Sequence, residues 1–351
     1  MIATTSGNLL EADVDALVNT VNTVGVMGKG IALQFKRAYP AMFADYAAAV
    51  KRGELVMGRM HVWDTGQLNG PRFVINFPTK RHWRAQSRLA DIESGLDDLV
   101  TVIRNERIRS VAIPPLGCGH GGLDWAVVEP LIRAKLTTLE DVNVLLFPPA
   151  GAPPASAMQD ARPKPAMTAG RAALIEVIRR YSDVALEGAT PIAVQKLMYF
   201  LQASGEDLKL RFESNRYGPY ADNLRAVLRD VEGHYLEGFG DGSKLVELSE
   251  PFRILPGARE AAEHLLANRE ATLRRIDRVM ELTWGFESTN SLELLATVHW
   301  VAQHPQAAGR TDEDIVAEVR RWSARKSRLF TSGQIHKALA ALRDGGWLSA
   351  T

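Results

Sequence analysis

The sequence has little of what marks secreted, membrane-bound or strongly nucleic-acid-binding proteins. Its 351 residues include a single cysteine, Cys118, which excludes a disulfide within the chain and a zinc site built from several thiolates. No apolar run is long enough to cross a bilayer, and the N-terminus lacks the basic-then-apolar pattern of a secretory signal. The net charge of +1 provides no overall attraction to nucleic acid. We therefore expect a cytoplasmic protein, without a metal centre or cofactor.

Residues 1–150 alternate short apolar segments with amphipathic ones. The expected strands are 2–5, 16–21, 59–62, 73–77, 110–113 and 142–147, and the expected helices are 31–38, 41–52, 87–105 and 125–135. This alternation predicts a three-layer α/β/α sandwich around a mixed sheet. Ligands of such sheets bind beyond the carboxyl ends of the strands.

The remaining sequence differs in character. Residues 151–168 are rich in proline and alanine, which predicts a linker. Residues 169–351 predict a second, mainly α-helical domain with a turn at 215–220. The helices expected there cover 171–181, a segment from Pro191 to about 201, a segment following the turn, 260–283, 291–301, 312–323 and 332–343.

One stretch, residues 18–32, organises the first domain. It begins as an apolar strand, passes through two asparagines and three glycines, and ends as the start of a helix. Glycine allows sharp turns and close approach of a ligand to backbone N–H groups, and a helix N-terminus favours anions. The stretch therefore predicts a loop for a phosphate-bearing ligand, with Asn22 at its edge.

A second glycine-rich loop, residues 114–123, also lies between an expected strand and an expected helix. Two such loops at matching strand ends can hold a diphosphate from both sides. The first loop is no P-loop, because Thr23 stands where that motif needs glycine and Gly30 replaces its Ser/Thr. The second contains a nominal Gly-x-Gly-x-x-Gly at 117–122, but the linker follows too soon for a dinucleotide-binding domain.

Several motifs in the order expected of one family carry a resemblance. They are residues 7–10, 14–22, 25–31 and 114–119, and together they resemble a macrodomain, the ADP-ribose-binding fold, over about the first 150 residues. Residues 27–36 and 76–83 narrow the resemblance to the DNA ADP-ribosyl glycohydrolase antitoxins, which are partnered by DNA ADP-ribosyltransferase toxins. Many macrodomains carry an aspartate for adenine where this chain has Asn8.

The resemblance implies the site. Lys80 would act at the anomeric carbon, either as a neutral amine that attacks it or as a charged group that polarises the substrate. His120 is a candidate for proton transfer, and Asn22 would hold the distal ribose. The implied ADP-ribose contacts are Asn8, Leu9, Asn19, Asn22, Gly25, Val26, Met27, Gly28, Lys29, Gly30, Ile31, Thr79, Leu116, Gly117, Cys118, Gly119, His120 and Gly121.

Two residues of the second loop bear on which leaving group and which nucleophile the reaction uses. Related lysine-dependent hydrolases of glutamate esters carry an aspartate where this chain has Gly121, which argues for a different leaving group. Cys118 lies between glycines, and a small buried thiol explains it better than a nucleophile.

Basic side chains and a tryptophan follow Lys80 directly. Such a combination suits single-stranded nucleic acid, because charges track the phosphates and the ring stacks on a base. The candidate DNA-binding residues are Arg81, His82, Trp83 and Arg84.

The sequence thus predicts an enzyme that removes ADP-ribose from thymidine in single-stranded DNA; the base and the N-glycosidic bond are implied by the resemblance. The alternatives are an ADP-ribose reader that inhibits a toxin sterically, and an ADP-ribosyl hydrolase acting on protein. The helical domain weakly resembles the SocA-like domain of other antitoxins and would bind the cognate toxin. Residues 206–250 hold ten acids against six bases, which suits a basic partner.

Overall fold

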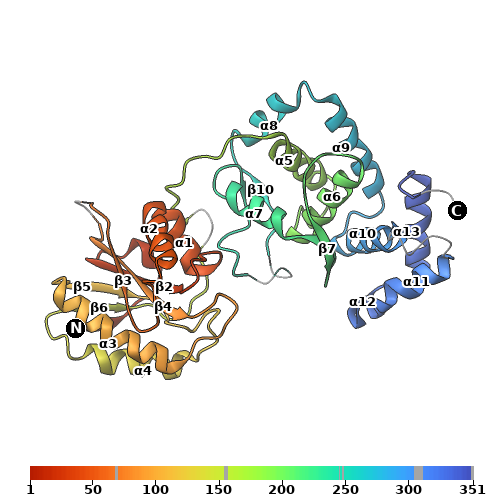
Figure 1. Ribbon diagram of the computed structural model, residues 1–351. Helices are drawn as coiled ribbons and strands as arrows, with labels where there is room; N and C mark the ends of the chain where they lie inside the picture. Colours follow the sequence, from red (N-terminus) through yellow and green to blue (C-terminus); the bar gives the residue numbers. More distant parts are fainter. Residues whose placement is uncertain (68–69, 154–156, 245, 247–248, 304–310, 349–351) are drawn as a thin grey trace. The chain divides into compact units, whose positions relative to one another are not determined.

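The computed structural model describes residues 1–351 except 68–69, 154–156, 245, 247–248, 304–310 and 349–351 (Figure 1). The described chain divides into two compact units. The first comprises Met1–Pro163 with the short segment Gly240–Ser243, and the second comprises Lys164–Phe239 and Lys244–Thr351.

The first unit is built on a six-stranded sheet in the order β1-β6-β5-β2-β4-β3. Its strands are β1 (Ile2–Thr4), β2 (Ala16–Asn22), β3 (His61–Asp64), β4 (Phe73–Lys80), β5 (Ser110–Ile113) and β6 (Asn143–Leu146). Neighbouring strands are parallel except β3, which runs antiparallel to β4. The sheet is therefore mixed, as predicted.

Helices cover both faces of this sheet (Figure 1). On one face α3 (Leu89–Asn105) and α4 (Trp125–Leu136) pack against apolar residues such as Val18 and Ile75. On the other, α1 (Gly30–Ala38) and α2 (Pro40–Lys51) pack against residues such as Leu17 and Val74. Successive strand residues point to opposite faces, so each central strand supplies both cores. The predicted three-layer sandwich is confirmed.

The second unit is mainly helical, also as predicted. Two small antiparallel sheets accompany its helices: the hairpin of β7 (Phe212–Asn215) and β8 (Gly218–Ala221), and the pair of β9 (Leu236–Glu237) and β10 (Arg253–Ile254). The helices are α5 (Ala169–Ser182), α6 (Pro191–Ala203), α7 (Asp222–Val231), α8 (Ala258–Leu266), α9 (Glu270–Thr283), α10 (Thr289–Gln303), α11 (Asp312–Arg321), α12 (Ala324–Leu329) and α13 (Ser332–Asp344).

Three details of this unit differ from the sequence-based expectation. The segment 260–283 is not one helix, because a turn closed by Arg269 N–H donating to the Leu266 carbonyl separates α8 from α9. No glycine or proline marks that break. The expected turn at 215–220 is the tip of the β7–β8 hairpin, where Gly218 has a φ of +86°. Helix α12, capped by Ser323, was not predicted.

Candidate functional site

Three central strands place the predicted site residues at one edge of the sheet. Strand β2 lies between β4 and β5 and runs parallel to both, so the carboxyl ends of all three meet. Beyond β2 lies the first glycine loop, beyond β5 lies the second, and Lys80 is the last residue of β4. Segments far apart in sequence thus form one site.

Lys80 and the second loop are in direct contact. The Lys80 Nζ donates a hydrogen bond to the main-chain carbonyl of His120. Partial burial lowers the pKa of Lys80, since removing water disfavours the ammonium form. A neutral amine is therefore more accessible here than on an exposed lysine.

His120 also reaches the first loop through its ring. A Cβ at Gly30 would lie 3.7 Å from Cδ2 of His120, which is van der Waals contact. Gly30 begins α1 with a φ of +59°, a conformation that glycine adopts without strain. Lys80, His120 and the N-terminus of α1 therefore lie close together.

Asn22 organises the first loop. Its Oδ1 accepts the N–H groups of Val24 at 3.1 Å and Val26 at 3.3 Å, and its Nδ2 donates to the Val26 carbonyl at 2.5 Å. An amide nitrogen carries two hydrogens, so one donor remains for a ligand such as a ribose hydroxyl.

Some predicted contacts lie beneath the site. Asn19 is fully buried, and its Nδ2 donates to Asn76 Oδ1 at 2.8 Å. Leu9, Met27, Thr79 and Leu116 are also buried. These side chains therefore pack beneath the loops.

Cys118 is half-buried and a poor nucleophile. Burial, helped by the nearby Asp124 carboxylate, raises the pKa of the thiol to about 11. Because the thiolate is the reactive form, the thiol is inert near neutral pH.

Gly121 has no room for a side chain. A Cβ there would lie 2.1 Å from the Gly117 carbonyl oxygen and 2.3 Å from Ser87 Oγ. Ser87 N–H in turn donates to the Gly121 carbonyl at 2.9 Å. The Gly117 carbonyl and the Ser87 side chain thus leave no room for a carboxylate at position 121.

The segment after Lys80 displays an aromatic side chain. Trp83 is 46% exposed, its ring lies 5.3 Å from that of His82, and the Arg84 guanidinium lies 4.4 Å from it. Arg81 instead makes a two-pronged ion pair with Asp91, at 2.6 and 2.9 Å. All four predicted DNA-binding residues are exposed; Arg81 is held by its ion pair, whereas the Arg84 guanidinium lies over the Trp83 ring.

Asn8 has a local structural task. Its Oδ1 accepts the Leu10 N–H at 3.1 Å and caps a short 3₁₀ helix, Leu9–Glu11, while its Nδ2 donates to Glu11 and to the Ala157 carbonyl. Its side-chain amide is therefore already engaged in the absence of a ligand.

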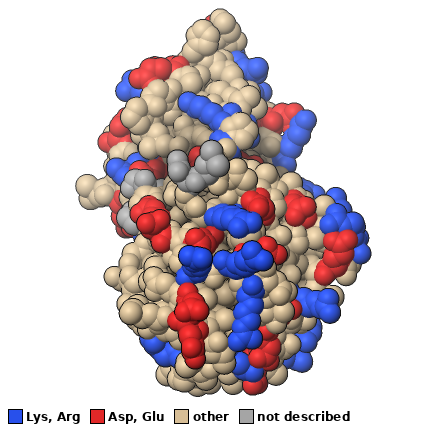
Figure 2. All heavy atoms as spheres, turned by 90° about the vertical axis from the view of Figure 1, so that its left-hand side faces the viewer, with Lys and Arg blue, Asp and Glu red and all other residues tan. Residues whose placement is uncertain are grey.

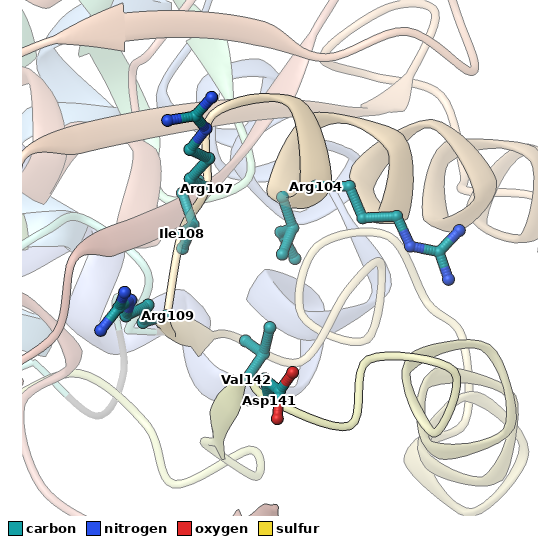
Figure 3. Close-up of a pocket in the computed structure, with 7 residues that line it drawn as sticks. Arg104, Arg107, Ile108, Arg109, Asp141 and Val142 are labelled. Atoms are coloured by element: carbon teal, nitrogen blue, oxygen red, sulfur yellow. The ribbon is translucent and has the colours of Figure 1, made fainter.

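A cavity elsewhere in the unit does not belong to this site. It lies at the amino ends of β5 and β6, the opposite edge of the sheet, and is lined by Ile103, Arg104, Arg107, Ile108, Arg109, Asp141 and Val142 (Figure 3). Its arginine side chains point in different directions rather than toward one point. Figure 2 shows basic and acidic side chains interspersed over the left-hand side of Figure 1, with no continuous basic surface.

Among the described residues, no three His, Cys, Asp or Glu side chains are grouped so as to hold a metal ion. None of their helices is long and apolar enough to cross a membrane.

Comparison with known proteins shows the family to which this chain belongs. The Macro domain family model matches residues 18–132. A DNA ADP-ribosyl glycohydrolase of Mycobacterium tuberculosis is 46% identical, over 97% of this chain and 98% of its own. One from Thermus aquaticus is 44% identical, over 99% and 94%. A DNA ADP-ribosyl transferase-DNA ADP-ribosyl glycohydrolase fusion protein of Thermosipho africanus is 38% identical over 38% of each chain. With a macrodomain as its N-terminal unit and close similarity along nearly its whole length, this chain belongs to the DNA ADP-ribosyl glycohydrolases, a family of hydrolases.

Proposed function

We propose that the first unit hydrolyses the N-glycosidic bond between ADP-ribose and a thymidine base in single-stranded DNA. The observation that carries this proposal is the contact between the Lys80 amine and the His120 carbonyl, set between two glycine loops. The bond between the anomeric carbon and the base nitrogen breaks. Water provides the hydroxyl that ends on the anomeric carbon of ADP-ribose and the proton that ends on the nitrogen of the released base. The reaction is therefore balanced without a cofactor.

Each part of the site has a task in this reaction. The loops around Gly25–Gly30 and Gly117–Gly121 present backbone N–H groups to the diphosphate. Asn22 holds the distal ribose, and Lys80 acts at its anomeric carbon. His120 is the candidate group for moving a proton to the leaving base. Trp83 and Arg84 hold the neighbouring nucleotides by stacking and by charge.

Release of ADP-ribose from a modified oligonucleotide tests the proposal. We expect Lys80→Ala to lower the rate at least about a hundredfold, as loss of a catalytic proton-transfer or nucleophilic group does. Lys135→Ala is the matched control, because Lys135 lies near the end of α4, where it pairs with Asp97. Equal rates for the wild type and Lys80→Ala would remove Lys80 from the mechanism. Binding of ADP-ribose without turnover by the wild type would favour a reader instead.

We further propose that the second unit binds a DNA ADP-ribosyltransferase toxin. The Thermosipho africanus relative supports this pairing, since its name joins a transferase and a glycohydrolase in one chain. Full-length Lys80→Ala should then still inhibit the toxin in a DNA-modification assay, although it no longer removes the modification. Loss of inhibition in step with loss of hydrolysis would contradict a separate binding role.

A further inference from the structure

The register between β2 and β4 changes at the site itself. Val21 lies opposite Pro78, but Asn22 lies opposite Lys80, so Thr79 is an extra residue in β4. Thr79 Oγ1 lies 3.4 Å from the Val21 carbonyl oxygen, which holds the extra residue at the shift. Such bulges re-aim side chains, because a one-residue shift reverses the face on which a side chain emerges. Here the shift places Asn22 opposite Lys80, a position that Thr23 would take without the shift in register.

A buried tyrosine holds the strand at this point. Tyr46, on α2, is fully buried, and its hydroxyl donates to the Asn22 main-chain carbonyl at 2.6 Å. The same oxygen lies 3.4 Å from Asn22 Oδ1. Burial raises the pKa of Tyr46, so the hydroxyl stays protonated and remains a donor.

The ring of Tyr46 is fixed by its surroundings. It packs 6.3 Å from the Phe43 ring and edge-on to the His61 ring, with centroids 6.4 Å apart. The hydroxyl therefore comes to Asn22 from a rigid position and adds no flexible side chain to the site. A donor held in this way fixes its partner more firmly than a mobile one.

We propose that Tyr46 is a positioning residue for the hydrolysis and acts by fixing Asn22 at the level of Lys80. The inference rests on the proposed function, because it takes Asn22 as the residue that holds the ribose. Tyr46 touches no substrate. Its hydroxyl keeps the Asn22 backbone in place. The Nδ2 hydrogen of Asn22 that is not donated to the Val26 carbonyl then faces the bound ribose.

Tyr46→Phe tests this inference in the full chain, because it removes one oxygen and keeps the packed ring. We expect kcat/KM on an ADP-ribosylated oligonucleotide to fall about tenfold, as the loss of one well-placed hydrogen bond does. Tyr39→Phe, at another buried tyrosine of the first unit, is the matched control and should leave the rate unchanged.

A double-mutant cycle shows whether Tyr46 acts through Asn22. In the Asn22→Ala background, Tyr46→Phe should change kcat/KM by less than about twofold, since its target is gone. The rise of kcat/KM with pH, which follows the loss of a proton from Lys80, should keep the same midpoint in Tyr46→Phe. The proposal would be overturned if the two substitutions lowered kcat/KM additively, or if Tyr46→Phe shifted that midpoint. It would also be overturned if Tyr46→Phe left the rate unchanged or failed to fold.

Failure of the proposed function would look different. If the wild type released no ADP-ribose from the oligonucleotide, calorimetry with free ADP-ribose would replace the kinetic assay. Tyr46→Phe should then weaken ADP-ribose binding in the wild-type background. In the Asn22→Ala background it should leave the affinity for ADP-ribose unchanged. Equal affinities for the wild type and Tyr46→Phe would overturn the positioning role independently of the reaction.

Discussion

The amine of Lys80 donates its hydrogen bond to the main-chain carbonyl of His120, forty residues further along the chain. A carbonyl accepts this bond from either the ammonium or the neutral amine, so the contact orients Lys80 without fixing its charge. Partial burial lowers the pKa of Lys80 and favours the neutral form. The charge of Lys80 during the reaction can therefore be read from the pH dependence of the rate.

We expect kcat/KM to rise with pH and to level off above the lowered pKa of Lys80, because only the neutral amine can attack the anomeric carbon. Lys80→Arg should then be inactive, since a guanidinium stays charged. The attack forms the bond from Nζ to the anomeric carbon and breaks the bond to the base, which leaves with a proton. Opening of the ribose ring turns this glycosylamine into an imine, and borohydride should reduce the imine to a stable adduct at Lys80, detectable by mass spectrometry. Retained activity in Lys80→Arg, without any trapped adduct, would show that the lysine acts through its charge alone.

Gly121→Ala should disrupt the second glycine loop. The added Cβ would lie 2.1 Å from the Gly117 carbonyl oxygen, so the backbone must shift. We expect a loss of about 1–3 kcal/mol in the free energy of unfolding, as for other overpacked sites, together with weaker ADP-ribose binding by calorimetry. Gly119→Ala is the control for stability, because no atom lies within 4 Å of the Cβ it would add. Equal melting temperatures for the two variants would show that the loop accommodates the methyl group.

Trp83→Ala should separate DNA binding from ADP-ribose binding. The exposed ring is stacked beside His82 and Arg84, and a base stacked on an aromatic ring contributes about 1–3 kcal/mol. We expect KM for a modified oligonucleotide to rise about five- to hundredfold, with unchanged affinity for free ADP-ribose. Trp83→Phe should recover most of the loss. An unchanged KM in Trp83→Ala would place the DNA elsewhere.

The second unit should become more stable as the pH rises above neutrality. Burial, reinforced by the nearby Lys326 charge, lowers the pKa of Lys196 to about 7 from its ordinary 10.5. Between these values the unfolded chain binds more protons than the folded one, so the free energy of unfolding increases with pH. Denaturant unfolding at pH 7 and pH 9 measures this change. Lys196→Met should reduce it to the part that comes from Lys326, whose pKa burial also lowers, whereas Lys337→Met, at an exposed position on α13, should preserve it.

Glu293 should be essential to the stability of the same unit. Its buried carboxylate accepts Lys326 Nζ at 2.5 Å and an Arg325 nitrogen at 2.6 Å, and Lys326 is itself buried. Glu293→Gln leaves the Lys326 charge uncompensated, which costs about 3–5 kcal/mol when one partner of a buried pair is lost. A loss below about 1 kcal/mol in denaturant unfolding would show that water reaches Lys326.

The amino-acid sequence by itself determined the elements of the first unit and the residue types of its site. Strand β5 was predicted with its observed bounds, and both glycine loops follow predicted strands, because apolar periodicity and glycine turns are local signals. The same kind of signal failed at 260–283, where the break between α8 and α9 is made by a backbone hydrogen bond and not by a breaking residue.

Only the tertiary structure decided which of these residues meet. The order β5-β2-β4 brings Lys80 to His120, and the extra Thr79 brings it level with Asn22. Packing between segments distant in sequence places Tyr46 beneath Asn22 and Ser87 against Gly121. Strand order, register and side-chain partners depend on contacts between distant segments, and no local pattern in the sequence specifies them.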